Sequence, residues 1–282
     1  MEILDSIEAM QAWRKSVPHP VRVSFAPTMG NLHAGHISLI DQAKINGDIV
    51  VASIFVNPMQ FGENEDLDAY PRTLVADLEK LEAAGTAAVF TPTIDDIYPE
   101  GVEYHTSVDV PGLTDVLCGA SRPGHFKGVT TVVSKLFGAV QPDVAVFGAK
   151  DLQQVLIIKK MVRDLLLPTE IVTVPTIRET DGLAMSSRNG YLTPREREVA
   201  PRFSQVLADC AEAIANNPGA IETALNAART ALISQSFKID YLEARKTFDL
   251  STAMSADDDV ALFGAVYLGK TRLIDNRLIR SR

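Results

Sequence analysis

The sequence lacks the residues and segments that several large classes of protein need. It has only two cysteines, Cys118 and Cys210, which are too few and too far apart for a disulfide framework and fit a reducing compartment. Its longest nearly apolar run, residues 49–56, is far too short to cross a bilayer. The first residues have neither the basic nor the apolar segment of a signal peptide. We therefore expect a cytoplasmic protein with no membrane partner.

Positive charge is also scarce. The chain has 27 Lys and Arg against 36 Asp and Glu, for a net charge of −9 over 282 residues. General nucleic-acid binding needs a basic face, so we expect no nucleic-acid partner, and any polyanion must be bound locally. A hydrophobic content of 46% and a charged content of 22% are typical of a globular protein with ample core.

The first 175 residues alternate between strand and helix patterns. Two-sided apolar runs predict strands, and periodic segments between them predict helices. This alternation indicates a parallel sheet with helices on both faces, an α/β fold in which ligands bind beyond the carboxyl ends of the strands. The predicted strands are 21–26, 49–56, 87–90, 144–147 and 170–174, and the predicted helices are 36–46, 73–84, 129–140 and 152–165.

The pattern changes after Pro175. Ala-rich amphipathic helices are predicted over 193–216 and 219–234, the first capped by Thr193 with Pro194 at its first position. Alternating strands follow over 238–244, 260–268 and 271–275, the last two joined by a tight turn at Gly269-Lys270. We expect domains over 1–175 and 176–282, the second a smaller α+β domain joined closely to the first.

The segment Phe25-Ala-Pro-Thr-Met-Gly-Asn-Leu-His33-Ala-Gly-His36 carries the clearest chemical signal. It predicts a strand, a glycine-containing turn and a helix whose first turn holds His33 and His36 on one face. A helix start offers unpaired N–H groups and partial positive charge, so this site suits anionic oxygen, above all nucleotide phosphate. A metal half-site or a purely structural pair remain alternatives, although a closed zinc site needs more ligands.

Three further groups of polar residues lie at predicted strand ends, in a turn, or one helical turn beyond such an end. Gly148-Ala-Lys150-Asp151 pairs an ammonium with a carboxylate, Met185-Ser-Ser-Arg188-Asn-Gly190 supplies two hydroxyls and a guanidinium, and Gln60 and Gln153-Gln154 supply neutral amides. A surface salt bridge, an ordinary polar loop and solvated glutamines are the respective alternatives. Neither a P-loop nor a GxGxxG motif is present, because His125 follows Gly119-Ala-Ser-Arg-Pro-Gly124 where a P-loop has Lys.

Together these segments resemble a known family. His33-Ala-Gly-His36 and Met185-Ser-Ser-Arg188 are similar to the signature pair of the nucleotidylyltransferase superfamily, and six blocks in order closely resemble the pantothenate synthetase (pantoate–β-alanine ligase) family. Leu273-Ile-Asp-Asn276 extends the likeness toward the C-terminus. The six blocks are Pro27-Thr-Met-Gly-Asn-Leu-His33, Ser53-Ile-Phe-Val-Asn-Pro-Met-Gln-Phe61, Tyr70-Pro-Arg-Thr73, Gly119-Ala-Ser-Arg-Pro-Gly-His125, Gly148-Ala-Lys-Asp151 and Asp181-Gly-Leu-Ala-Met-Ser-Ser-Arg-Asn-Gly-Tyr191.

The resemblance implies ATP-dependent condensation of (R)-pantoate with β-alanine to pantothenate, AMP and pyrophosphate through a pantoyl-adenylate. It also implies a Rossmann-like first domain, a C-terminal lid, a homodimer, Mg²⁺ with the ATP and no tightly bound organic cofactor. His36 is implied as the proton donor, with His33, Lys150 and Arg188 also catalytic; Gln60 and Gln154 are implied to bind substrate. The ATP site is implied to comprise Met29, Gly30, Asn31, Leu32, His33, Ala34, Gly35, His36, Gly148, Ala149, Lys150, Asp151, Ile177, Met185, Ser186, Ser187 and Arg188.

The residues agree with that chemistry. Adenylation needs cations and N–H donors to position and stabilise phosphate oxygens, not a protein nucleophile. An adenylyltransferase that keeps AMP on its product, or a nucleotide-binding regulatory module without turnover, are the rival interpretations. The sequence names no protein ligand for Mg²⁺.

Overall fold

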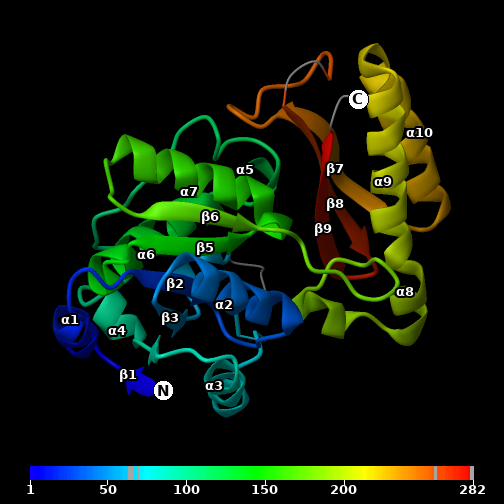
Figure 1. Ribbon diagram of the computed structural model, residues 1–282. Helices are drawn as coiled ribbons and strands as arrows, with labels where there is room; N and C mark the ends of the chain where they lie inside the picture. Colours follow the sequence, from blue (N-terminus) through cyan, green and yellow to red (C-terminus); the bar gives the residue numbers. More distant parts are fainter. Residues whose placement is uncertain (63–66, 69, 257–258, 280–282) are drawn as a thin grey trace.

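The computed structural model describes residues 1–62, 67–68, 70–256 and 259–279 and consists of two packed parts (Figure 1). The first part contains a six-stranded parallel sheet with helices on both faces. The second contains a three-stranded antiparallel sheet with two long helices against it. The predicted fold class, α/β followed by a smaller α+β part, is confirmed.

The parallel sheet has the strand order β1-β4-β3-β2-β5-β6. Its central strands are buried on both faces because Val, Ala, Phe and Ile side chains fill both sides, and helices must cover both. The order reverses between β2 and β5, so the ends of these two neighbours open the crevice in which ligands bind in such sheets. The strands are β1 (Glu2–Leu4), β2 (Val23–Thr28), β3 (Ile49–Ile54), β4 (Ala88–Phe90), β5 (Val144–Gly148) and β6 (Glu170–Val174).

Separate helices cover the two faces. On one face α1, α6 and α7 pack against Phe25, Phe90 and Phe147 in a single apolar cluster. On the other face α2 and α3 bury Ile40 and Leu81. No helix of the described residues is both long and apolar enough to cross a membrane. The helices of the first part are α1 (Ile7–Ser16), α2 (Ala34–Asn46), α3 (Leu74–Ala83), α4 (Ile94–Ile97), α5 (Cys118–Ser121), α6 (His125–Val140) and α7 (Leu152–Asp164).

Two elements at the start of the chain were not predicted. Strand β1 has three residues, too few to show an alternating pattern, and pairs in parallel with β4 at the sheet edge. Helix α1 begins after Ser6, whose hydroxyl accepts a hydrogen bond from the N–H of Ala9. The ends of other helices and strands differ from the predicted ends by a few residues. A helix begins where a capping residue stands, and the spacing of apolar residues does not mark that position.

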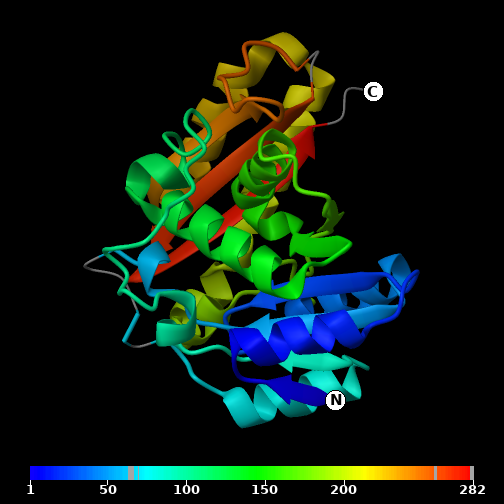
Figure 2. The same cartoon turned by 90° about the vertical axis from the view of Figure 1, so that its left-hand side faces the viewer.

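The second part is built from β7 (Lys238–Lys246), β8 (Val260–Leu268) and β9 (Thr271–Ile279). Helices α9 (Pro201–Asn216) and α10 (Ile221–Ser234) cover one face. The opposite face carries Tyr241, Phe263 and Ile274 into the apolar cluster of the first part. Figure 2 shows this sheet lying between the yellow helices behind it and the green helices of the first part. The two parts therefore share core.

The single helix predicted over 193–216 is in fact two. Helix α8 (Pro194–Val199) begins at the predicted Thr193 cap, whose hydroxyl accepts from the N–H of Glu196. A new helix starts at Pro201, because proline has no N–H to donate within a continuing helix and its ring collides with the preceding turn. The periodic apolar pattern runs across this break, which is why the pattern alone missed it.

Candidate active site

The turn after β2 is held by a buried carboxylate that the sequence analysis did not single out. Gly30 and Asn31 both have positive φ angles, +83° and +51°. Asp77 of α3, fully buried, accepts hydrogen bonds at 2.8 Å from the N–H groups of Asn31 and Leu32. Asp77 lies one helical turn before the buried Leu81. An acidic residue on the apolar face of a predicted helix could therefore have pointed to this role in the sequence.

His33 and His36 fix one another at the start of α2. The N–H of Gly35 donates to Nδ1 of His33 at 3.1 Å, and the N–H of His33 donates to Nδ1 of His36 at 3.3 Å. Each Nδ1 is thus an acceptor without a proton, and each neutral ring carries its proton on Nε2. We expected unpaired N–H groups here; instead the histidine side chain caps the helix, and two Nε2–H groups remain as donors.

Both imidazoles are neutral at pH 7. Burial, then the charges of Lys150 and Lys80, lower the pKa of His33 to about 4. Burial, then His33 and Lys150, lower the pKa of His36 to about 3, although Asp151 opposes the shift. The two rings lie with centroids 4.2 Å apart, so they form one compact donor pair. In the free protein this pair offers hydrogen bonds, while Lys150 supplies positive charge.

The turn between β5 and α7 brings Lys150 and Asp151 to the same place. Residues Ala149–Asp151 form the short helix η2 directly after β5, the neighbour of β2 in the sheet. No described residue forms an ion pair or hydrogen bond with the Lys150 ammonium or the Asp151 carboxylate, so the surface-salt-bridge alternative is not seen. Both side chains line the cavity that His33 and His36 face.

A hairpin forms the opposite wall. Arg178 pairs with Ala184 in an antiparallel bridge, and the N–H of Met185 donates to the carbonyl of Ile177 at 3.0 Å. The chain then enters the short helix η3 (Ser187–Tyr191), capped by Ser186. The Ser187 hydroxyl donates to the carbonyl of Asn31 at 3.3 Å, which ties this wall to the turn after β2.

The glutamines take different roles. Gln60 lies in η1 (Pro58–Gln60). Its side-chain oxygen Oε1 accepts a hydrogen bond from the Asn57 side-chain amide at 3.2 Å, and its side-chain NH2 group contacts the Met29 sulfur. The amide of Gln153 is buried and bonds to the backbone of residues 113, 116 and 118. Gln154 instead lines the cavity, and no described residue forms a hydrogen bond with its amide. The structure therefore separates two glutamines that the sequence presented together.

One cavity of about 260 Å³ collects most of the predicted residues. A second of about 290 Å³ adjoins it and shares Lys150, Asp151, Gln154, Ser186 and Arg188 with it. Gly30, Asn31, Leu32, Ala34 and Ala149 lie outside the lining of the first. Their backbone instead shapes the two turns. The predicted residues that line it are Met29, His33, Gly35, His36, Gln60, Gly148, Lys150, Asp151, Gln154, Ile177, Met185, Ser186, Ser187 and Arg188.

Few carboxylates are available for a cation. Asp151 is the only Asp or Glu among the described residues lining the first cavity, and these residues contain no group of three or more His, Cys, Asp or Glu that could hold a metal ion. Mg²⁺ usually keeps several waters and binds one or two carboxylates plus substrate phosphates. The donor set fits an ion that arrives with a polyphosphate.

A parallel sheet whose central strand ends carry paired imidazoles and an ammonium, faced by a hydroxyl-rich turn, defines a nucleotide-binding α/β enzyme. A family model described as pantoate-beta-alanine ligase matches residues 2–278. The chain belongs to this family.

Individual relatives agree over the whole chain. Pantothenate synthetase of Shewanella amazonensis is 56% identical over 99% of this chain and 98% of its own length. The crystal structure of pantothenate synthetase from Thermus thermophilus has a TM-score of 0.91 at 42% identity and covers 99% of both chains. Pantoate-beta-alanine ligase from Francisella tularensis, complexed with beta-gamma ATP and beta-alanine, has a TM-score of 0.81 at 36% identity and covers 99% of this chain and 97% of its own.

Proposed function

We propose that the cavity between the strand ends and the hairpin is the active site in which this ligase joins pantoate to β-alanine. The enzyme forms an amide bond at the expense of ATP and releases AMP and pyrophosphate. A pantoate carboxylate oxygen attacks the α-phosphorus of ATP, the bond from that phosphorus to pyrophosphate breaks, and a pantoyl-adenylate forms. The β-alanine amine then attacks the acyl carbon, the bond to AMP breaks, and the nitrogen loses a proton.

The phosphates of ATP are assigned to the end of the cavity where His33, His36 and Lys150 meet. The single observation that carries this assignment is the capping of α2 by the two histidines, which fixes both tautomers and leaves two Nε2–H donors on residues that line the same cavity as Lys150. Preorganised donors of this kind stabilise charge that grows on phosphate oxygens as pyrophosphate leaves. Ser186, Ser187 and Arg188 are assigned to the same phosphates from the hairpin.

The proton-donor role implied for His36 takes a specific form here. A ring whose pKa is lowered to about 3 holds no extra proton at pH 7, so in the free enzyme His36 donates a hydrogen bond. A bound polyphosphate brings negative charge, which raises the pKa of a neighbouring imidazole. We therefore assign proton donation to the ATP-bound state.

Pantoate is assigned to the region between Gln60 and Gln154, with Gln60 also near β-alanine. The Gln60 amide is oriented by Asn57, and the Gln154 amide faces the cavity. Neutral amides suit hydroxyl and carboxylate oxygens. Ile177 is assigned to adenine through its backbone, and its carbonyl already binds Met185 in the hairpin.

Four broader assignments accompany these roles. Asp151, the one Asp or Glu among the described residues lining the first cavity, is the candidate ligand for a Mg²⁺ ion that would accompany ATP and would supply charge neutralisation at the phosphates. No tightly bound organic cofactor takes part. The chain divides near residue 175 into a nucleotide- and pantoate-binding domain and a C-terminal lid. The enzyme is a homodimer and works in the cytoplasm. The resemblance to the family supports the first three, and the scarcity of cysteine supports the cytoplasmic location.

Exchange of labelled pyrophosphate into ATP tests the reaction and its order. Pantoate without β-alanine is expected to support exchange, because adenylation is complete before the amine is needed. Adding β-alanine is expected to release AMP and form pantothenate. Exchange that appears only with all three substrates present contradicts the adenylate route, and AMP retained on the product indicates an adenylyltransferase instead.

A further inference from the structure

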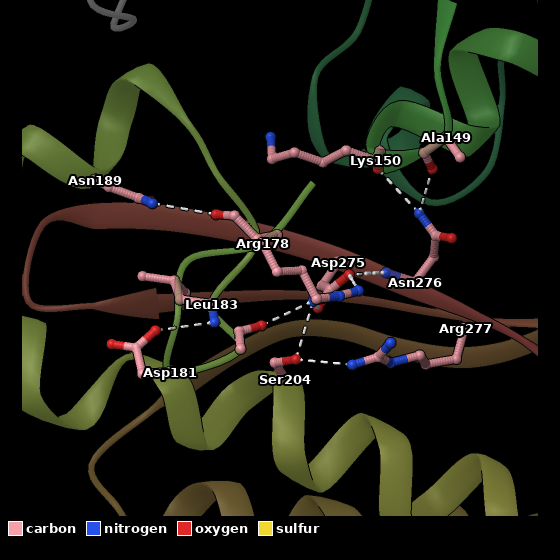
Figure 3. Close-up of polar contacts among 12 residues, drawn as sticks. Ala149, Lys150, Arg178, Asp181, Leu183, Asn189, Ser204, Asp275, Asn276 and Arg277 are labelled. Atoms are coloured by element: carbon pink, nitrogen blue, oxygen red, sulfur yellow. Dashed lines mark hydrogen bonds and ion pairs between the residues drawn. The ribbon is translucent and has the colours of Figure 1, made fainter. Parts of the chain in front are cut away.

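One residue of the second part contacts the backbone on both sides of Lys150. The side-chain amide of Asn276, on β9, donates to the carbonyl of Ala149 at 2.8 Å and to that of Lys150 at 2.9 Å (Figure 3). Asn276 is 9% exposed, so these two bonds are largely shielded from water. The side-chain NH2 group of asparagine has two N–H hydrogens, so it can donate one to each carbonyl.

These two bonds restrain the backbone from which the Lys150 side chain extends. The Ala149 carbonyl belongs to the peptide plane before the Lys150 Cα atom, and the Lys150 carbonyl belongs to the plane after it. Anchoring both planes fixes both backbone torsions of Lys150. Within the described residues no hydrogen bond or ion pair holds its ammonium, so the anchored backbone sets where the flexible side chain starts and in which direction its first bond points. Figure 3 shows the Lys150 side chain extending away from the Asn276 amide.

The position of Asn276 is itself fixed by its neighbour. Because side chains alternate along a strand, Asp275 and Asn276 point to opposite faces of the sheet. The buried Asp275 carboxylate binds Arg178 through two parallel hydrogen bonds of 2.7 and 2.9 Å (Figure 3). Arg178 also donates to the carbonyl of Gly182 in its own hairpin and to Ser204 on α9. Strand β9 therefore holds the hairpin wall with one residue and the Lys150 turn with the next.

We propose that Asn276 is a positioning residue for Lys150, acting through the Ala149 and Lys150 carbonyls. The proposal rests on the phosphate-binding role assigned above to Lys150. Asn276 lines the second cavity but not the first, and its side-chain NH2 group is committed to the two carbonyls. Through them it helps to place the ammonium where charge develops as pyrophosphate leaves. Displacing a charge-stabilising group by about 1 Å costs on the order of 100-fold in rate. The second part thus contributes to adenylation through the backbone of the first.

Single-turnover pyrophosphate formation from ATP and pantoate tests the proposal in Asn276→Ala and Asn276→Asp. Aspartate keeps the shape of the side chain but, when ionised, turns two donors into acceptors facing two carbonyls. Both variants are expected to lose about 10- to 100-fold in adenylation rate. The pantoate KM is expected to stay within about twofold, because Gln60 and Gln154 are untouched.

A double-mutant cycle with Lys150→Ala separates positioning from general damage. If Asn276 acts through Lys150, adding Asn276→Ala to Lys150→Ala changes the rate by less than about twofold. An equal loss in both backgrounds, or no loss in the wild-type background, overturns the proposal. Asn276→Asp decides the matter if Asn276→Ala melts below the assay temperature.

Ser121→Ala is the matched control. The Ser121 hydroxyl donates to Asp240 of the second part at 3.1 Å, so this variant also removes a hydrogen bond between the two parts but lies outside both cavities. Its adenylation rate is expected to equal that of the wild type. The wild-type enzyme separates the two proposals. If it forms no pyrophosphate from pantoate and ATP, the proposed function is wrong. If the wild type turns over normally and Asn276→Ala has the same rate, only the positioning role of Asn276 is wrong.

Discussion

The histidine pair and Lys150 meet in one cavity but are held in place in opposite ways. His33 and His36 are fixed by hydrogen bonds within four residues of chain, from the N–H groups of Gly35 and His33 to ring nitrogens. Lys150 is fixed from β9, more than a hundred residues away, through Asn276. One group of phosphate-facing donors is set by local sequence, and the other by the packing of the second part on the first.

This contrast separates two sources of catalytic precision. The imidazoles keep their tautomer as long as α2 begins where it does, whatever the second part does. The Lys150 backbone keeps these two hydrogen bonds only while β9 remains docked. If Asn276 positions Lys150 as proposed, undocking of β9 is expected to shift Lys150 and to leave the histidines in place.

The largest effect is expected from the locally fixed pair. In His36→Ala the loss of one preorganised donor is expected to slow adenylation by about 100- to 1,000-fold, or about 3–4 kcal/mol in the barrier. ATP affinity is expected to fall much less, because the contact strengthens in the transition state. Single-turnover adenylation and ATP titration measure the two quantities. A near-wild-type rate returns both histidines to a structural role.

His36→Gln distinguishes catalysis from capping. Glutamine at this third helical position accepts the N–H of the cap residue, as in a common capping box, so α2 keeps its start. The ring Nε2–H is lost, and the glutamine NH2 group is the only donor that remains on this side chain. We expect a melting profile close to the wild type and a rate loss similar to that of His36→Ala; a recovered rate indicates that the reaction does not need the imidazole ring.

A smaller effect, on stability, is expected at the distant anchor. The Asp275 side chain is 2% exposed, and Asp275→Asn removes the carboxylate that pairs with the Arg178 guanidinium. Breaking a buried ion pair of this kind costs about 3 kcal/mol in the free energy of unfolding. Denaturant unfolding measures the loss. The matched control is Asp181→Asn in the same hairpin, whose partner Arg197 is exposed, so about 1 kcal/mol or less is expected. Equal losses contradict the special role of Asp275.

The same division between local and distant decides what the sequence could predict. The spacing of apolar residues and the turn residues in short stretches of sequence predicted both sheets. They also predicted the strand–turn–helix segment at His33. Asn276 was noticed only as part of a resemblance, because its partners are carbonyl groups, which every residue has. Asp77 escaped notice for the same reason: it binds two backbone N–H groups of the turn after β2. Pro201 was a local signal for a helix break, but the apolar period continued across it and led to the prediction of a single helix.

The smallest effect is expected where two adjacent glutamines differ. Gln154→Ala removes one neutral hydrogen-bond partner from the proposed pantoate site, worth about 0.5–1.5 kcal/mol. The pantoate Kd is therefore expected to rise roughly 2- to 12-fold while ATP affinity and melting stay unchanged.

Gln153→Ala, one residue earlier, is expected to leave pantoate binding unchanged and to lower stability. It strips buried partners from the Cys118 N–H and from the Leu113 and Val116 carbonyls, so it lowers the free energy of unfolding by about 2 kcal/mol. Calorimetric titration with pantoate, followed by denaturant unfolding of both variants, measures the pair. Weaker binding of pantoate and ATP alike in Gln154→Ala would mean that this side chain supports the fold and does not bind the substrate.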